Sequence, residues 1–387
     1  MPHVLIRGLE GGVVAQSAKS KVYGEEGRLI YGGYAIEDLA EHVTFEEVIH
    51  LLWYGELPTT AQLAALHAEL AAHRAVPDGI AAVLRDLPAA AHPMAVLRTL
   101  VSALGCLDNA DAEAAAHDEA ARWRCAKRLV AQLPTLIAAH ERQRRGQPFV
   151  APRADLGHAA NFLYMLHGAE PGPRAVRALD AYLVLLADHG FNASTFSARV
   201  TISTESDPYS AITTAIGTLK GPLHGGANER VMAMLEQIGD PARAEAYVES
   251  TLASKGRIPG IGHRVYKTLD PRAGVLRRLS EDLVAEVGDS PERRYHDIAV
   301  RVADAAAAWF EANRPDLRLH PNVDFYSAIA LRVAGVPTDQ FTPLFAMSRV
   351  AGYTAHMIEQ YADNRLIRPR GDYVGPMART VVPIEER

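Results

Sequence analysis

The chain has 387 residues, 48% of them hydrophobic and 22% charged, which is enough for about two domains with a sizeable core. This composition excludes a disordered chain. Forty basic and forty-six acidic side chains give a formal net charge of −6, so no overall basic excess points to nucleic acid as a partner. The two cysteines, Cys106 and Cys125, match neither a CxxC motif nor a disulfide framework.

The sequence also favours a protein that works away from membranes. No run of eighteen apolar residues is uninterrupted, so we expect no transmembrane helix. The N-terminal residues lack the apolar core and cleavage site of a signal peptide. We therefore expect a soluble, cytoplasmic protein.

The first 145 residues predict a short β-rich segment followed by helices. Within the first 35 residues, β-favouring side chains stand among glycines and indicate one or two short strands. Farther on, Thr44 precedes Glu47 by three residues, and Thr59 precedes Gln62 by the same spacing. This is the spacing of a capping box at a helix N-terminus. Alanine-rich helical stretches then continue to about residue 145.

The second half of the chain also reads as helical. Residues 146–154 predict a connecting loop, and apolar residues at helical spacing follow between 176 and 186. Asp207 and Pro208 suit the cap and first position of another helix. Long alternating strands, internal repeats and heptad arrays are absent from the sequence. The fold class that we predict is all-α.

Two histidines stand beside glycines at predicted helix ends. His189 follows one helix, and its simplest interpretation is a histidine favoured by the negative end of the helix dipole. His224 precedes another helix, where the dipole disfavours protonation. A neutral imidazole there can donate a hydrogen bond to a carbonyl, but an ordinary tight turn explains His224 and its glycines equally well.

The densest cluster of polar groups is residues 255–272. A Gly/Pro-rich loop there carries five cationic side chains and His263, which suits a ligand with several phosphates or carboxylates. The alternative is a solvated basic loop. The segment is neither a Rossmann fingerprint nor a P-loop, since both glycine patterns are incomplete.

Asp324 and two arginines complete the set of candidates. Asp324 reads most simply as a helix cap, although its apolar neighbours would raise its pKa toward useful basicity if they desolvated it. Arg349 and Arg368, taken alone, read as surface arginines. A metal-dependent hydrolase would use the histidines and Asp324 as ligands, but HExxH and close ligand pairs are missing from the sequence. A non-catalytic helical protein is the other alternative.

Three segments of the sequence resemble the citrate synthase family. They are HGGANERV, GIGHRVYKTLDPR and PNVDFYSAI, in this order along the chain. The resemblance extends from the N-terminal GLEGG to the C-terminal RPRGDYVGP and is greatest to the compact bacterial and archaeal citrate or 2-methylcitrate synthases. It implies a large helical domain, 1–218 with 324–387, and a small helical domain, 219–323, with the active site in the cleft between them.

The resemblance also implies a reaction, the condensation of acetyl-CoA with oxaloacetate and water to give citrate and CoA, without a metal or other cofactor. Propionyl-CoA, giving 2-methylcitrate, is the alternative substrate. Asp324 would remove the α-proton of the acyl-CoA, and His224 would donate a hydrogen bond to the thioester oxygen. His263 would polarise the oxaloacetate carbonyl.

Two binding sets follow from the same resemblance. The implied oxaloacetate ligands are His189, Arg272, Arg349 and Arg368. We expect a homodimer in which Arg368 reaches the site of the other subunit. The implied CoA contacts are Arg257, Ile258, Pro259, Gly260, Gly262 and Lys267.

Overall fold

A computed structural model describes residues 5–9, 11–263, 265–286, 288–317 and 319–387. Helices dominate this part of the chain, which confirms the all-α prediction. The first eleven are α1 (Ile36–His42), α2 (Phe45–Tyr54), α3 (Thr60–His73), α4 (Asp78–Asp86), α5 (Pro93–Leu107), α6 (Asn109–Ala114), α7 (Glu119–Arg144), α8 (His158–His167), α9 (Pro173–Leu186), α10 (Ala193–Ser203) and α11 (Pro208–Leu219). The chain continues with α12 (Ala227–Ile238), α13 (Ala244–Ala253), α14 (Pro271–Glu286), α15 (Pro291–Asn313), α16 (Val323–Val333) and α17 (Phe341–Ala362).

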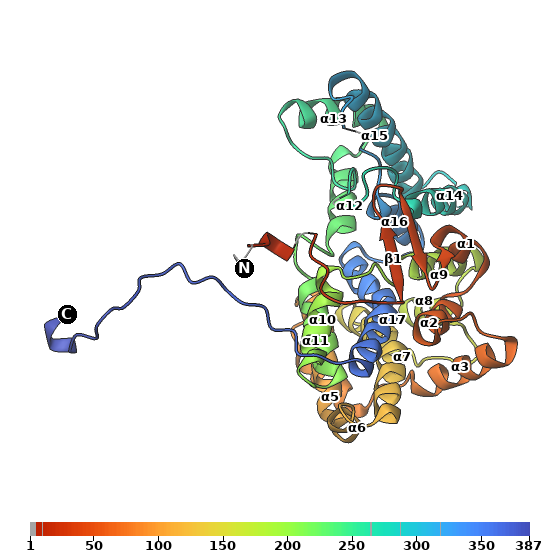
Figure 1. Cartoon of the computed structure of the whole chain (residues 1–387). Helices are drawn as coiled ribbons and strands as arrows, with labels where there is room; N and C mark the ends of the chain where they lie inside the picture. The colour runs from red at the N-terminus through yellow and green to blue at the C-terminus, as the bar shows by residue number, and fades with distance from the viewer. Residues whose placement is uncertain (1–4, 10, 264, 287, 318) are drawn as a thin grey trace.

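Helices α12 to α15 lie together at one end of the molecule, at the top of Figure 1, and most of the others form the larger body below. Helix α16 contacts both groups, since it packs against α12, α14 and α15 as well as against α9. The boundary between the two predicted domains, at residues 218/219 and 323/324, therefore falls among packed helices and stays a prediction.

The predicted β-rich segment near the N-terminus is a small antiparallel sheet. Its strands are β1 (Ser20–Tyr23), β2 (Arg28–Tyr31) and β3 (Tyr34–Ala35), with Ser20 of β1 opposite Tyr31 of β2. Tyr31 is fully buried and donates a hydrogen bond from its hydroxyl to the carbonyl of Asp188, at 2.7 Å. The sheet is thus attached to the loop that follows α9.

Local capping signals read from the sequence are confirmed. Thr44 and Thr59 each form a complete capping box at the start of α2 and α3. Asp207 caps α11, and Pro208 is its first residue. These contacts satisfy amide groups that the first turn of a helix leaves without partners, so they fix where each helix begins.

Helix α17 runs through the centre of the larger body and packs against α2, α7, α9, α10 and α11. It is buried on all sides for most of its length, as expected of a helix in the middle of a core. Its polar side chains must therefore find partners inside the protein. Arg349 is one of them and is only 1% exposed, so its interpretation as a surface arginine was wrong.

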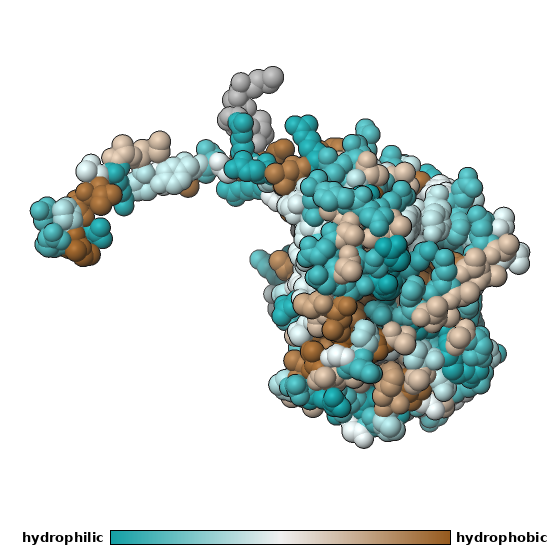
Figure 2. All heavy atoms as spheres, turned by 90° about the horizontal axis from the view of Figure 1, so that it is seen from below, coloured by the Kyte–Doolittle hydropathy of each residue, from teal (hydrophilic) through white to brown (hydrophobic). Residues whose placement is uncertain are grey.

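The chain beyond α17 leaves the body as an extended tail that ends in a single 3₁₀ turn, Ile384–Glu386 (Figure 1). Figure 2 shows the tail standing clear of a surface on which polar side chains surround scattered apolar patches. Several apolar side chains of the tail are exposed, among them Tyr373, Val374, Met377, Val381 and Ile384. No helix in the described part of the chain is long and apolar enough to cross a membrane.

Candidate active site

Most of the predicted catalytic and oxaloacetate-binding residues meet between segments that are far apart in sequence. His189 follows α9, His224 precedes α12 and His263 precedes α14. Asp324 lies in the first turn of α16, and Arg349 lies on α17. The rings of His189 and His263 are 5.8 Å apart, and the charges of Arg272 and Arg349 act on both His189 and Asp324.

The imidazole of His263 has a defined tautomer. Its Nδ1 accepts hydrogen bonds from the backbone amides of Val265 and Tyr266, at 3.0 and 3.1 Å. Burial, with Arg272 nearby, lowers its pKa to about 4, so the ring is neutral at physiological pH. The one ring proton is therefore on Nε2, which can donate it to a substrate oxygen.

His224 is held through a serine that the sequence reasoning missed. Its Nε2 lies 2.7 Å from the hydroxyl of Ser194, which also accepts a hydrogen bond from Tyr353 at 2.7 Å. Burial, followed by the charge of Arg349, lowers the pKa of His224 to about 4. The single hydroxyl proton of Ser194 has two acceptors within reach, Nε2 of His224 and Oδ1 of Asn192 at 2.8 Å. In the arrangement in which Ser194 donates to Nε2, the ring proton of His224 sits on Nδ1 and is available to a substrate carbonyl.

His189 is neutral as well. Burial, with Arg272 and Arg349, lowers its pKa well below the ordinary value. Its Nε2 lies 3.1 Å from the hydroxyl of Tyr266, a second residue that the sequence reasoning missed. The three neutral histidines can therefore form hydrogen bonds with a substrate without adding positive charge to the site.

Arg272 forms a buried, two-pronged ion pair with Asp270. Its Nε and Nη2 donate to the two carboxylate oxygens at 2.9 Å each, and the side chains are 3% and 1% exposed. Asp270 also accepts the backbone amide of Val323 at 3.0 Å. One carboxylate thus joins the first turns of α14 and α16. Among the described residues, Arg272 makes its hydrogen bonds through the backbone amide, Nε and Nη2 and none through Nη1.

Arg349 is anchored by its Nε, which donates to the carbonyl of Leu186 at 2.7 Å. Its guanidinium also lies over the ring of Phe345, 4.7 Å from the centroid. Leu186 is the last residue of α9, just before the segment that carries His189. Arg349 therefore combines a buried positive charge with a fixed position beside that segment.

The carboxylate of Asp324 is a stronger base than that of an ordinary aspartate, because its pKa is raised. Burial raises its pKa to about 6 against the lowering effect of Arg272, and the charge of Asp270 adds to the rise. The prediction that Asp324 caps its own helix was wrong, because the cap is Asn322, whose side chain accepts the amide of Asp324 at 3.0 Å. The carboxylate of Asp324 is thus left for other contacts.

The predicted CoA segment, 257–262, lies against the residues that lead into α16. Gly262 donates its amide to His320 at 2.8 Å, and Asn322 donates to the carbonyl of Gly260 at 2.9 Å. Ile258 is buried and Pro259 is half-buried. Arg257 and Lys267 are exposed, so the structure does not gather them with the histidines. The same is true of Arg368, which is on the tail.

A substitution at Gly260 would test how closely the segment 257–262 is packed. Its φ of +76° disfavours any side chain, and a Cβ would lie 2.8 Å from Phe325 and from Val231. We expect Gly260→Ala to lower the free energy of unfolding by about 2–4 kcal/mol. Urea denaturation measures this.

Gly274 provides the matched control, since it lies inside α14 and a Cβ there meets nothing within 4 Å. Gly274→Ala should be neutral or stabilise by about 0.5–1 kcal/mol. A Gly260→Ala protein as stable as the original would show that the segment is not packed as described.

A hollow of about 430 Å³ lies beside His189, between the N-terminal segment and residues 189–192, with Val265 also on its wall. In the described part of the chain, the His, Cys, Asp and Glu side chains form no group of three or more arranged to hold a metal ion. Neutral histidines beside a carboxylate of raised pKa and two buried arginines are typical of enzymes that use acid–base chemistry.

Comparisons with known proteins identify the family. The family model for the C-terminal domain of citrate synthase matches residues 8–370. Citrate synthase 2 of Bacillus subtilis is 48% identical over 98% of this chain and 99% of its own length. 2-Methylcitrate synthase 2 of Corynebacterium glutamicum is 43% identical over 98% of this chain and 97% of its own length. The chain therefore belongs to the citrate synthase family of condensing enzymes, as the sequence motifs indicated.

A solved structure agrees over the whole chain. Citrate synthase of Thermoplasma acidophilum, in a ternary complex with carboxymethyl coenzyme A and oxaloacetate, superposes with a TM-score of 0.89 at 32% identity. The alignment covers 100% of both chains.

Proposed function

We propose that this protein is a citrate synthase, which condenses acetyl-CoA with oxaloacetate and water to give citrate and CoA. The observation that carries the proposal is the cluster of side chains in which neutral His224 and His263 accompany the carboxylate of Asp324, whose pKa is raised to about 6. The Thermoplasma relative in complex with oxaloacetate and a CoA analogue supports both substrates.

In the proposed mechanism, Asp324 removes a proton from the methyl group of acetyl-CoA. His224 donates a hydrogen bond to the thioester oxygen and so stabilises the enolate as it forms. The enolate carbon attacks the keto carbon of oxaloacetate while His263 donates its Nε2 proton toward the developing alkoxide. Water then hydrolyses the thioester of citryl-CoA and releases CoA. These steps use side chains of the protein and one water molecule, so the proposal includes no cofactor.

Oxaloacetate carries two carboxylates, and the proposed site offers matching cations. Arg272 and Arg349 are buried, which strengthens their attraction for an anion. His189 supplies a neutral hydrogen-bonding group beside them. Planar guanidinium groups are well suited to bind carboxylates with two hydrogen bonds.

We also propose a homodimer in which the tail of each subunit lies against the other. The support is that the tail leaves its own body and exposes apolar side chains (Figure 1). Arg368 is on this tail and would complete the oxaloacetate site of the second subunit. The proposed CoA contacts are Arg257, Ile258, Pro259, Gly260, Gly262 and Lys267. They belong to residues 219–323, and we propose that these residues move as a domain. Cytoplasmic localisation stays a prediction from the sequence.

The choice of acyl group can be tested with two substrates. We expect kcat/KM with oxaloacetate to be higher for acetyl-CoA than for propionyl-CoA, by about 10–200-fold, since one methylene is worth about 1–3 kcal/mol in a pocket. CoA release without oxaloacetate is the blank. A preference for propionyl-CoA would instead assign 2-methylcitrate synthesis, the activity named for the Corynebacterium relative.

The role of Asp324 as a base predicts a pH dependence. Only the ionised carboxylate accepts a proton, so kcat/KM for the acyl-CoA should rise with pH through about 6 and then level off. His224 and His263, with pKa values near 4, stay neutral over this interval. Rates measured from pH 5 to 8 would contradict the role if they fell with rising pH.

A further inference from the structure

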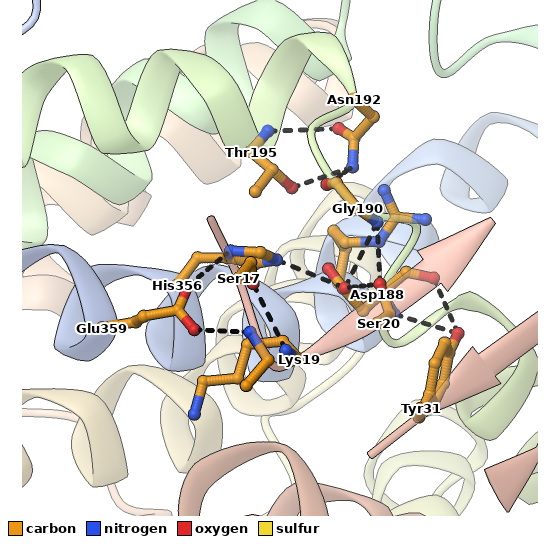
Figure 3. A network of polar contacts seen from close by, with 12 residues as sticks. Ser17, Lys19, Ser20, Tyr31, Asp188, Gly190, Asn192, Thr195, His356 and Glu359 are labelled. Carbon is orange, nitrogen blue, oxygen red and sulfur yellow. Dashed lines mark hydrogen bonds and ion pairs between the residues drawn. The ribbon is translucent and has the colours of Figure 1, made fainter. Parts of the chain in front are cut away.

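The carboxylate of Asp188, the residue before His189, is completely buried and held from several sides (Figure 3). Its Oδ2 accepts a close hydrogen bond from the hydroxyl of Ser20 and another from Nε2 of His356, 3.3 Å away. The amide of Gly190 points at the same pair, 3.0 Å from Ser20 Oγ and 3.3 Å from Asp188 Oδ2. Asp188 thus ties the segment after α9 to strand β1 and helix α17.

The tautomer of His356 follows from its second neighbour. Arg199 Nη1 lies 3.1 Å from Nδ1 of His356, and a guanidinium can only donate hydrogen bonds. Nδ1 therefore accepts, and the ring proton is on Nε2, directed at Asp188. His356 is itself fully buried, so this contact is not exchanged for water. Its orientation is fixed on both sides.

The chain of contacts continues to the N-terminal segment. Arg199 Nη1 also donates to Glu359 at 2.6 Å, and Glu359 accepts the backbone amide of Ala18 at 2.9 Å. Ala18 is two residues before Ser20, which returns the network to Asp188. The network is therefore closed, and it joins α10, α17 and β1 around one carboxylate (Figure 3).

The segment held by this network, residues 188–194, carries part of the proposed active site. Residue 189 is a proposed oxaloacetate ligand, and Asn192 caps α10 at the turn that includes Ser194, the partner of His224. A small displacement of Asp188 would move His189 directly, because the two residues share a peptide bond. Hydrogen bonds weaken steeply when the distance or angle departs from the favoured geometry, so a displaced His189 would bind oxaloacetate less tightly.

We propose that His356 and Ser20 are positioning residues for oxaloacetate, which act by fixing Asp188 and through it His189. The inference rests on the proposed function and deepens it. Both residues lie outside the set that the sequence and the family resemblance assign. Their removal should affect the oxaloacetate half of the reaction and spare the acyl-CoA half.

The test compares two substitutions of His356. In His356→Leu, the KM for oxaloacetate and its calorimetric Kd should rise about tenfold or more, while the KM for acetyl-CoA and kcat at saturating oxaloacetate stay within about threefold. His356→Gln should recover most of the affinity, since its amide NH2 can donate to Asp188 and its amide oxygen can accept from Arg199. A simple structural role for the ring would not produce this split.

Thr354 gives a matched control on the same helix. It is fully buried and accepts a hydrogen bond from the indole of Trp53 at 2.9 Å, on a contact that does not involve Asp188. Thr354→Val should lower the melting temperature but leave the KM for oxaloacetate unchanged. If both α17 variants changed this KM equally, general loosening of the helix would explain the effect and the inference would be wrong.

Ser20→Ala keeps the inference testable if His356→Leu does not fold, since Ser20 is only half-buried and the change removes a single hydroxyl. It should raise the oxaloacetate KM several-fold. If the unsubstituted protein is active and Ser20→Ala leaves the KM for oxaloacetate unchanged, the inference is wrong but the proposed function stands. An unsubstituted protein that neither binds nor condenses oxaloacetate would overturn the proposed function as well.

Discussion

Replacing Asp324 with Asn should reduce kcat for condensation by about 10²–10⁴-fold, because the amide cannot accept the α-proton of the thioester. The affinity for oxaloacetate should stay within about threefold. Asp324 is at the start of α16, whereas the proposed oxaloacetate cations are on α14 and α17, and the cap of α16 is Asn322. Steady-state kinetics with a calorimetric titration of oxaloacetate would measure both quantities.

Asp282→Asn is the control for this substitution, because it makes the same chemical change on an exposed part of α14. It should leave both kcat and binding unchanged. Loss of oxaloacetate affinity in Asp324→Asn, with turnover intact, would show that Asp324 is a binding residue and not the base.

Replacing Arg272 with Leu should affect both binding and stability. Oxaloacetate affinity should fall by about 30-fold or more, since a buried charge partner is removed. The free energy of unfolding should also fall by about 3–5 kcal/mol, because Asp270 is left buried without its cation. Denaturation by urea and titration with oxaloacetate separate the two effects.

A second substitution distinguishes these contributions further. Asp270→Asn combined with Arg272→Leu removes the unpaired charge, so it should recover part of the stability but none of the oxaloacetate affinity. Arg277→Leu is the control on the same helix, where an exposed pair with Glu281 is worth about 1 kcal/mol or less. If Arg272→Leu weakened only CoA binding, its assignment to oxaloacetate would be wrong.

The sequence predicted those parts of the structure that depend on near neighbours. The capping boxes at Thr44 and Thr59 join residues three positions apart, so their pattern is visible in the chain itself. The all-α class follows from the same local signals. The gathering of the histidines, Asp324 and Arg349 was expected only from the family resemblance, because no spacing rule connects segments that are tens of residues apart.

What the sequence did not indicate depends on contacts across the fold. Arg349 read as a surface arginine because its burial is decided by the helices around α17. Asp270 and Tyr266 lie in the cationic segment, residues 255–272, but their partners Val323 and His189 are on other elements. Ser194 follows Asn192, the cap of α10, by two residues, and only the structure shows that it contacts His224.

The most direct test of the proposed activity is to identify the products formed after exhaustive chelation of metals. The protein is incubated with acetyl-CoA and oxaloacetate, and free CoA and new tricarboxylates are measured by thiol assay and mass spectrometry. We predict that CoA and citrate appear in equal amounts, at a rate that chelation does not change, and only when oxaloacetate is present. CoA release that is independent of oxaloacetate, or activity that requires a metal, would contradict the account.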